Sequence, residues 1–325
     1  MSGEGALSVS VALCTFNGER YIEEQLVSIL TQTRPPVEVV ISDDMSTDAT
    51  LDIARRVASA HGSAPVRILH NVDRLGVTRN FERAVAASIG DVIALSDQDD
   101  RWYPERVEAL MAVLEANPAI RLVHHDAALI GADGKPLGHS LLDSLRVSRS
   151  ERTLLDGGPG FTALIRRNLA TGATMMFRRE LLDVALPFPA SWVHDEWLAV
   201  VAAATGGVRL IERDLVAYRQ HEANQIGVQQ PTLRYRARRM LEKRGDRYGE
   251  LATKSRTLAD RLASIGVEPR WLDLARRKAE FEAVRARYPE SRLRRIPAVL
   301  RQSKRYPELS SQRALDLVRD LVQPA

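Results

Sequence analysis

Short runs of β-branched residues alternate with helical stretches over the first hundred residues, and this alternation limits the possible folds more than any other feature. The first two runs are VSVAL at 9–13 and VEVVIS at 37–42, and a helical stretch at 19–30 separates them. Strands that alternate with helices form βαβ units, which build parallel sheets. We therefore predict an α/β fold with a mostly parallel sheet flanked by helices.

The same pattern continues to about residue 220. Further strands are expected at 66–70, 91–96, 121–127, 172–177, 208–211 and 215–218. Further helices are expected at 48–60, 77–87, from Pro104 to Asn117, at 179–185 and at 194–204. The segment 138–160 contains GGPG and predicts a loop.

The charge of the chain changes sign near residue 230. Residues 1–230 hold 22 Lys and Arg against 30 Asp and Glu, a formal charge of −8, whereas residues 231–325 hold 24 against 12, a formal charge of +12. The second part is Arg-rich and helical in pattern. We predict an α/β domain over 1–230 and a basic helical extension over 231–325. An acidic domain suits metal binding through carboxylates, and a basic extension suits phosphates or an anionic membrane surface.

The location of the protein can also be approached from the sequence. The single cysteine, Cys14, can form no disulfide within the chain, which favours a reducing compartment. No apolar run approaches the roughly 20 residues that a membrane helix needs, and residues 1–8 lack the basic and apolar regions of a signal peptide. We expect a cytoplasmic protein, at the inner face of the membrane if its extension contacts lipid.

Polar side chains follow three of the expected strands, where ligands of open parallel sheets bind. They are Thr15, Asn17 and Glu19 after the first strand, Asp43 and Asp44 after the second, and Asp97, Asp99 and Asp100 after the fourth. The chain has neither GxGxxG after its first strand nor GxxxxGK[ST] anywhere. This disfavours a dinucleotide dehydrogenase and a P-loop NTPase.

The SDQDD run at 96–100 brings several carboxylates to the rim of the sheet, because it follows the apolar strand segment VIAL. Such groups repel one another unless a cation lies between them. Mg²⁺ and Mn²⁺ favour oxygen ligands and bind through one or two carboxylates plus substrate phosphates. The run predicts a site for Mn²⁺ or Mg²⁺, and the alternative is a solvated acidic turn that caps the next helix.

Four short motifs occur in order along the acidic part of the chain: TFNGE at 15–19, SDQDDRW at 96–102, HDEW at 194–197 and YRQHEAN at 218–224. Over about residues 9–227 the sequence resembles family 2 glycosyltransferases of GT-A fold, in a subgroup that includes rhamnosyltransferase-like enzymes of bacterial surface polysaccharide assembly. The resemblance implies a metal-dependent inverting enzyme that moves a sugar from a UDP- or dTDP-sugar to a glycan or lipid-linked acceptor. The QxxRW element of processive relatives is absent, which indicates transfer of a single sugar.

The resemblance also implies which residues bind the nucleotide-sugar. They are Thr15, Asn17, Glu19, Asp43, Asp44, Arg79 and Asp97. A carboxylate can accept the imide N–H of uracil or thymine, and Arg suits phosphate, which agrees with these roles. Asp43 and Asp44 could instead cap the helix at 48–60.

For the metal, the resemblance implies a DXD pair made of Asp97 and Asp99, with Asp99 the better ligand and Asp97 near the ribose. His221 could complete the site, or it could be a structural histidine. Asp100 could cap the next helix.

The HDEW motif matches the place where the family holds its catalytic base. Inverting transfer needs a carboxylate that takes the proton of the acceptor hydroxyl. The resemblance assigns this role to Asp195, and the alternative is that Asp195 only caps the helix and Trp197 is part of the core. The acceptor-binding residues that the resemblance implies are Asp126, His194, Glu196 and Trp197.

Two other function classes remain open at this point. A nucleotidyltransferase should show a Gly-rich basic loop after its first strand, whereas this chain has CTFNGERY there. A non-catalytic nucleotide-sugar-binding or scaffold protein would not need Asp97, Asp99 and Asp195 together. No nucleic-acid-reading motif is recognisable, so we expect no nucleic-acid partner.

The basic extension has two possible roles. It opens with Arg234, Arg236, Arg238, Arg239, Lys243, Arg244 and Arg247, interleaved with Tyr235, Met240, Leu241 and Tyr248. A helix with such a face could hold the enzyme on an anionic membrane. Alternatively, the helices form a bundle that packs on the acidic domain or on a second subunit.

Overall fold

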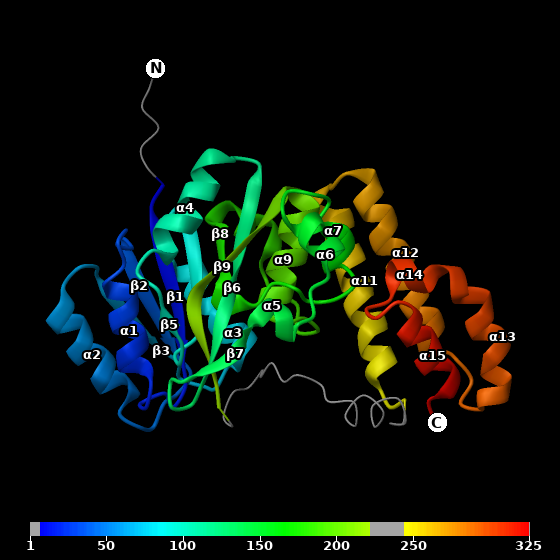
Figure 1. Ribbon diagram of the computed structural model, residues 1–325, viewed down its shortest axis with the longest axis horizontal. Helices are drawn as coiled ribbons and strands as arrows, with labels where there is room; N and C mark the ends of the chain where they lie inside the picture. The colour runs from blue at the N-terminus through cyan, green and yellow to red at the C-terminus, as the bar shows by residue number, and fades with distance from the viewer. Residues whose placement is uncertain (1–6, 222–243, 325) are drawn as a thin grey trace, which may run out of the picture. The chain divides into compact units, whose positions relative to one another are not determined.

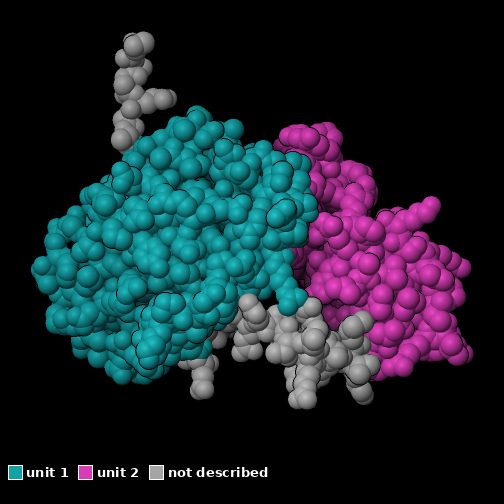
Figure 2. All heavy atoms as spheres, in the orientation of Figure 1, with its two compact units in different colours: residues 1–160, 169–228 teal, residues 161–168, 229–325 magenta. Residues whose placement is uncertain are grey.

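A computed structural model describes residues 7–221 and 244–324 of the chain (Figure 1). The chain divides into two units, which Figure 2 distinguishes by colour. Unit 1 comprises residues 1–160 and 169–228, and unit 2 comprises residues 161–168 and 229–325. The segment 161–168 thus belongs with the C-terminal helices, although it lies within the first of the two domains predicted from the sequence.

Unit 1 is built on a sheet that has nine strands within residues 7–221. Along its main path the order is β3-β2-β1-β4-β8-β6-β9-β5, and β7 pairs with β6. Strands β1 to β4 are parallel, as are β6 and β9, while β8 runs antiparallel between β4 and β6. The strands are β1 (Val9–Thr15), β2 (Glu38–Asp43), β3 (Val66–His70), β4 (Val92–Ser96), β5 (Arg101–Trp102), β6 (Ile120–Gly131), β7 (Pro136–Ser140), β8 (Met175–Arg178) and β9 (Gly207–Gln220).

Helices cover both faces of this sheet. They are α1 (Ile22–Leu30), α2 (Thr50–His61), α3 (Val77–Ala87), α4 (Arg106–Ala116), α5 (Leu141–Ser144), α6 (Arg149–Leu155), α8 (Leu182–Ala185) and α9 (His194–Thr205). Helices α1, α2 and α4 share one apolar core with the sheet, and α3 and α9 contact each other as well as the strands. Every residue of β1 and β2 is therefore buried, which explains their continuous apolar runs.

Three expectations from the sequence were wrong. The strand expected at 172–177 begins only at Met175, as β8, because Gly172–Thr174 form a 3-10 turn. The segment 138–160, expected to be a loop, contains α5 and α6, because Ser140 and Ser148 cap these helices and Ser148 forms a capping box with Glu151. The runs at 208–211 and 215–218, expected to be two strands, form the single strand β9. An irregularity in its pairing with β6 near residues 211–214 interrupts the apolar pattern without ending the strand.

Unit 2 is helical in the residues described. Its helices are α7 (Phe161–Leu164), α11 (Arg247–Ile265), α12 (Pro269–Ala286), α13 (Arg292–Gln302), α14 (Tyr306–Leu309) and α15 (Ala314–Val322). Gly266, with a φ of 69°, ends α11, and Pro269 opens α12, so these two long helices form a hairpin. Within residues 7–221 and 244–324, no helix combines the length and apolar character that crossing a membrane requires.

A buried ionic network joins four helices of unit 2. Asp320 of α15 accepts hydrogen bonds from Arg285 Nε of α12 at 2.7 Å and from the hydroxyls of Tyr248 and Tyr306. Arg285 also pairs with Glu282 at 2.9 Å. Burial raises the pKa of the Asp320 carboxyl, but Arg285 and the hydroxyl donors outweigh it and hold that pKa below its ordinary value. The network therefore keeps a buried charge compensated.

Replacing Arg285 by Met should strongly destabilise unit 2, because the buried Asp320 loses the cation that hydrogen-bonds it and keeps only the more distant Arg244, at 3.6 Å, as a cationic neighbour among the residues described. Loss of one partner from a buried ion pair costs about 3–5 kcal/mol. Chemical denaturation followed by circular dichroism measures the free energy of unfolding. Arg276→Met is the control, since Arg276 is exposed on the same helix. A loss below about 1 kcal/mol for Arg285→Met, the range of an exposed pair, would contradict this expectation.

Candidate active site

The carboxyl ends of β1, β2 and β4 meet at one edge of the sheet, because β1 lies between the other two. The loop after β1 and the loop after β4 are joined directly. Phe16 N donates to Gln98 Oε1 at 2.8 Å, and Gln98 Nε2 donates to Phe16 O at 3.0 Å. A Cβ atom on Gly18 would lie 2.2 Å from Gln98 Oε1, so this contact requires glycine. The sequence pattern did not single out Gln98, which lies between the two aspartates of the DXD pair.

The two aspartates after β2 fix the surrounding loops. Asp43 accepts hydrogen bonds from Thr15 Oγ1 at 2.7 Å and from Ser46 N at 2.9 Å. Asp44 accepts hydrogen bonds from Leu75 N at 2.6 Å and Gly76 N at 2.9 Å, just before α3. Neither aspartate caps α2, which begins after Ala49 without a side-chain cap, so the alternative that they cap this helix was wrong.

Asn17 and Glu19 point toward the start of α2. Asn17 Oδ1 accepts a hydrogen bond from Thr47 N at 2.9 Å, and Glu19 Oε2 accepts one from Ala49 N at 3.1 Å. Asn17 has a φ of 47°, a left-handed conformation that asparagine tolerates better than most residues. Both side chains thus hold the TFNGE loop against the positive end of a helix.

Two arginines lie near these loops. Arg79 is half exposed on α3 and pairs with Glu82 of the same helix at 2.7 Å. Arg74, which the sequence analysis missed, stacks its guanidinium 3.7 Å from the centre of the Phe16 ring and lies 3.9 Å from Asp44. Arg74 lies outside the four motifs, so its position beside Phe16 and Asp44 is known only from the structure.

The acidic loop after β4 holds a concentration of negative charge. Burial and the neighbouring charges of Asp99 and Asp195 raise the pKa of Asp97 to about 7. Burial and the charges of Asp99 and Asp97 raise the pKa of Asp100 well above its ordinary value. His221 Nε2, from the end of β9, lies 2.7 Å from Asp99 Oδ2. The structure therefore brings two of the predicted metal ligands, Asp99 and His221, into contact, and Asp97 lies on the same charged loop.

Arg219 fastens this loop to β9. Its backbone N donates to Asp100 Oδ1 at 2.9 Å, its Nε donates to Asp99 O at 2.7 Å, and its Nη2 donates to Glu24 Oε2 at 2.5 Å. Asp100 does not cap α4, whose N-cap is Glu105, so that alternative was wrong. The other oxygen of Asp100, Oδ2, is buried without a hydrogen-bond partner among the residues described. The YRQH motif contained Arg219, but its part in the site was not inferred.

The donor atoms of this loop fit a hard divalent cation. In the part of the chain that the structure describes, no three His, Cys, Asp or Glu side chains converge closely enough to hold a metal ion by themselves. Asp99 and His221 are nonetheless in contact, and the mutual repulsion of Asp97, Asp99 and Asp100 is the electrostatic condition that a cation relieves. Carboxylate oxygens with substrate phosphates are the ligands that Mg²⁺ prefers.

Asp195 lies in the first turn of α9 and faces the chain that enters β8. Its Oδ2 accepts a hydrogen bond from Gly172 N at 3.1 Å, and its Oδ1 accepts one from Glu196 N at 2.6 Å. The N-cap of α9 is Val193 and no side chain caps it, so the alternative that Asp195 caps this helix was wrong. The charge of Asp195 contributes to the raised pKa of Asp97, so the two carboxylates share one electrostatic environment.

The four residues expected at the acceptor site have different surroundings. Trp197 is fully buried and its Nε1 donates to Ala185 O at 2.8 Å, so it belongs to the core and the expectation that it contacts the acceptor was wrong. His194 is also buried, with its ring stacked 4.0 Å from that of Phe81, and burial lowers its pKa to about 3. This stacking against α3 fixes the first turn of α9, which also carries Asp195.

Asp126 and Glu196 differ from Trp197 and His194 in their contacts and exposure. Asp126 Oδ1 accepts hydrogen bonds from Ala127 N at 2.8 Å and Leu142 N at 2.9 Å, and it thereby anchors α5 to β6. Glu196 is partly exposed in the first turn of α9. Of the four, Glu196 is the most exposed, and Asp126 lies at the limit of burial with 9% of its surface exposed.

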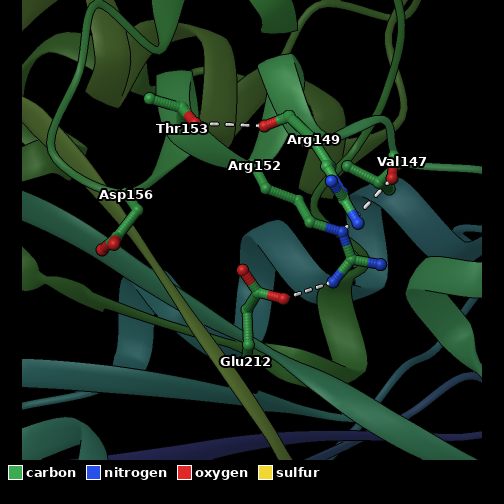
Figure 3. Close-up of a pocket in the computed structure, with 6 residues that line it drawn as sticks. All are labelled: Val147, Arg149, Arg152, Thr153, Asp156 and Glu212. Carbon is green, nitrogen blue, oxygen red and sulfur yellow. Dashed lines mark hydrogen bonds and ion pairs between the residues drawn. The ribbon is translucent and has the colours of Figure 1, made fainter.

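A separate pocket of about 590 Å³ lies between α6 and β9 (Figure 3). It is lined by Val147, Arg149, Arg152, Thr153, Asp156 and Glu212. Arg152 Nη1 donates to Glu212 Oε2 at 2.6 Å, and Asp156 pairs with Arg209 at 3.2 Å. Most of its charges are therefore already paired, and it contains none of the residues around Asp97 and Asp195.

Residues 10–183 match the model of the family described as glycosyl transferase family 2. The chain belongs to this family. A dTDP-rhamnosyl transferase, RfbG of Shigella flexneri, is 30% identical over 221 residues, which are 66% of this chain and 73% of that protein. The matches span between 59% and 73% of the length of this and two other curated relatives. The prediction of a family 2 glycosyltransferase with rhamnosyltransferase-like relatives is confirmed.

Solved structures support the fold of this family member. S. aureus TarS 1–349 in complex with UDP-GlcNAc has a TM-score of 0.54 at 19% identity and covers 96% of this chain and 90% of its own. The mannosyltransferase PcManGT from Pyrobaculum calidifontis, in complex with GDP-Man and Mn²⁺, has a TM-score of 0.51 at 19% identity and covers 93% and 76%. The predicted GT-A fold with C-terminal helices is confirmed, and so is the enzyme class.

Proposed function

We propose that this family 2 glycosyltransferase is a metal-dependent inverting enzyme that transfers one sugar from a UDP- or dTDP-sugar to a glycan or lipid-linked acceptor in cell-surface polysaccharide synthesis. One observation carries the proposal: the acidic loop after β4 brings Asp99 into contact with His221 at the chain end of β9, and Asp195 of α9 lies close enough to Asp97 on this loop for their charges to interact. A carboxylate for the donor and its metal next to a carboxylate for the acceptor is the arrangement that inverting transfer needs. The proposed compartment is the cytoplasm.

The donor is proposed to bind where β1, β2 and β4 end. The residues proposed to contact it are Thr15, Asn17, Glu19, Asp43, Asp44, Arg79 and Asp97. A carboxylate has about four acceptor sites, and Asp44 accepts three hydrogen bonds, so it retains capacity for a ligand. Asp43 is buried and already contacts Thr15, Ser46 and His70, so it would have to exchange one of these partners for the ligand. The RfbG relative, at 30% identity, is named for dTDP, which supports a pyrimidine nucleotide.

Asp97, Asp99 and His221 would hold Mn²⁺ or Mg²⁺ in this proposal. A bound cation supplies positive charge that offsets the negative charge developing on the leaving diphosphate. Arg219 contributes by holding the backbone of Asp99 and the side chain of Asp100 in place. The fixed loop then presents its carboxylates in one direction without further reorganisation.

Asp195 is proposed as the catalytic base. Its carboxylate takes the proton of the acceptor hydroxyl while that oxygen attacks the anomeric carbon opposite the diphosphate. Hydrogen bonds from Gly172 N and Glu196 N orient the carboxylate. Glu196 and Asp126 are proposed to contact the acceptor, and the stacking of His194 on Phe81 of α3 is proposed to fix the helix turn that carries Asp195.

The stabilising effect of a divalent cation should increase with pH. The pKa of Asp97 is about 7 in the folded protein, against about 4 for an ordinary aspartate. Between these values the folded state binds more protons than the unfolded chain, so the metal-free protein loses stability as the pH rises through this window. A cation competes with that proton, and the rise in Tm that Mn²⁺ causes should be larger at pH 8 than at pH 5.

Differential scanning fluorimetry with Mn²⁺ or a chelator at both pH values measures this effect. Asp99→Asn is the matched variant, because it removes the ligand in contact with His221, and it should reduce the rise in Tm at both pH values. Equal shifts at pH 5 and pH 8 in the unaltered protein would contradict the expected competition.

A screen of UDP- and dTDP-sugars tests the proposed function. With Mn²⁺ or Mg²⁺, one donor should be hydrolysed slowly to the free sugar and the nucleoside diphosphate, and a chelator should stop the reaction. Release of pyrophosphate from a nucleoside triphosphate and a sugar phosphate would identify a nucleotidyltransferase. Binding of a donor with no turnover in the presence of any acceptor or metal would favour a non-catalytic protein.

A further inference from the structure

Helix α15 is inverted in polarity relative to a normal surface helix. Its buried residues are Asp316 and Asp320, whereas Leu315, Val318 and Val322 are 58%, 42% and 38% exposed. These three apolar residues follow the spacing i, i+3, i+7 and therefore share one helical face. The buried acids are held inside by partners such as Arg285, so the inversion is fixed by the network in unit 2.

Helix α13 is inverted in part, because it buries Arg295 together with Val299. Leu293, Ile296 and Leu300, again at i, i+3, i+7, are 81%, 39% and 55% exposed, while Arg295 is buried. Helices α13 and α15 contact each other, and Arg295 Nη2 donates to Gln323 O at 2.9 Å. All the large apolar side chains that are exposed in the described part of unit 2 lie on these two helices. Such a concentration marks an interaction site.

The exposed charges on α13 and in the turn that follows it are all positive. Four exposed cations flank the leucines of α13 and have no ion-pair partner among residues 7–221 and 244–324: Arg292, Arg294, Arg301 and Lys304. Helix α13 contains no acidic residue. A second copy of the chain would bring the same unpaired cations to the interface, which opposes self-association through this face. An anionic and apolar partner satisfies both the leucines and the arginines.

We propose that the exposed faces of α13 and α15 form a docking surface for an anionic lipid bilayer. The leucines and valines enter the boundary between head groups and acyl chains, and the arginines pair with lipid phosphates. The inference does not depend on the chemistry of sugar transfer, although a lipid-linked acceptor would lie at the same surface.

This surface differs from the one that the sequence suggested. Residues 234–243 of the basic segment lie outside the residues described. Arg244 and Tyr248 lie inside them and face the interior of unit 2, since Arg244 stacks 3.9 Å from the Tyr248 ring and its Nη2 donates to Arg285 O at 2.7 Å. Arg244 and Tyr248 thus belong to the interior of a helical bundle. The proposal therefore places the lipid contact on α13 and α15.

Flotation of the full chain with vesicles tests the proposal. The protein should float with vesicles of phosphatidylcholine and phosphatidylglycerol at low salt, less at high salt, and not with phosphatidylcholine alone. The variant Leu293→Ser/Leu300→Ser/Leu315→Ser should bind at least about tenfold more weakly, because its apolar contact with the bilayer is lost. Replacing Arg292, Arg294 and Arg301 by Gln should weaken binding by roughly fivefold for each charge removed.

Val72→Ser/Ile89→Ser is the matched control, since these apolar side chains are 86% and 68% exposed in unit 1, and it should float like the unaltered protein. All the altered positions are exposed, and an unchanged Tm establishes that each variant is folded. Donor hydrolysis should also be unchanged in every variant, which separates failure of this inference from failure of the proposed function.

Three results would overturn the proposal. They are absence of flotation at low salt, equal binding to neutral vesicles, and unchanged binding of the triple serine variant. Sedimentation velocity tests the alternative that a second copy of the chain covers this surface. A dimer that the serine substitutions convert to a monomer, with vesicle binding unaffected, would identify the surface as a contact between two copies and would also overturn the proposal.

Discussion

Asp195→Asn should nearly abolish sugar transfer while nucleotide binding stays intact. The amide keeps one oxygen for the hydrogen bond from Gly172 N and loses the bond from Glu196 N, a local change that should leave the loops after β1, β2 and β4 in place. It cannot take a proton from the acceptor, and a positioned base contributes about 10²–10⁴-fold in rate. Turnover with donor and acceptor measures the loss, and calorimetry with UDP or dTDP and Mn²⁺ measures the binding.

Asp183→Asn is the matched control, because Asp183 is an exposed aspartate in the first turn of the neighbouring helix α8. It should retain full activity. If Asp195→Asn loses less than tenfold in turnover, the base lies elsewhere, and Glu196, partly exposed in the same turn, becomes the next residue to replace.

Asp99→Asn should remove the metal dependence of nucleotide binding. Asp99 is in contact with His221 and belongs to the most negative loop of the site. Loss of even an indirect partner of a metal site typically costs 10–100-fold in affinity, so we expect at least roughly this loss for UDP or dTDP in the presence of Mn²⁺. Calorimetry with Mn²⁺ and with a chelator measures both states.

The control for this variant is Asp52→Asn on α2, where the aspartate is 85% exposed and pairs only with Arg55 of its own helix. It should bind nucleotide like the unaltered protein. Should the unaltered protein bind nucleotide equally well in excess chelator, the DXD pair holds no metal and the proposed role of Asp99 is wrong.

The fold could be predicted from the sequence where burial is uniform. Strands β1 and β2 are covered on both faces, so their apolar runs are uninterrupted and unmistakable. Strand β9 is different, because an irregular pairing near residues 211–214 exposes polar residues in its middle, and the pattern resembled a turn. In 138–160 the glycines and Pro159 indicated a loop, whereas the capping box of Ser148 and Glu151 begins the helix α6 there.

The parts of the site that could be predicted from the sequence are those that follow from the order of the strands. The rule that ligands bind beyond parallel strand ends was enough to select the loops after β1, β2 and β4. It could not supply the contacts between Arg219 and Asp100 or between His221 and Asp99, which join residues about 120 positions apart and depend on how β9 lies in the sheet. A motif also does not separate a residue that touches the ligand from one that supports it, as Trp197 illustrates.

The antiparallel direction of β8 limits where the chain can be truncated without disturbing Asp195. Because β8 runs opposite to β4, the chain that enters β8 arrives at the edge where β4 ends, and Gly172 there holds Asp195. Only residues 169–171 separate Gly172 from the segment 161–168, which packs in unit 2 with the Phe161 ring 5.3 Å from that of Trp271. A truncation at residue 230 would strip this segment of its packing partners and leave the backbone that orients Asp195 tethered to an exposed apolar stretch. The C-terminal helices are therefore an integral part of the catalytic fragment, and a shortened enzyme has to keep them or replace residues 161–168.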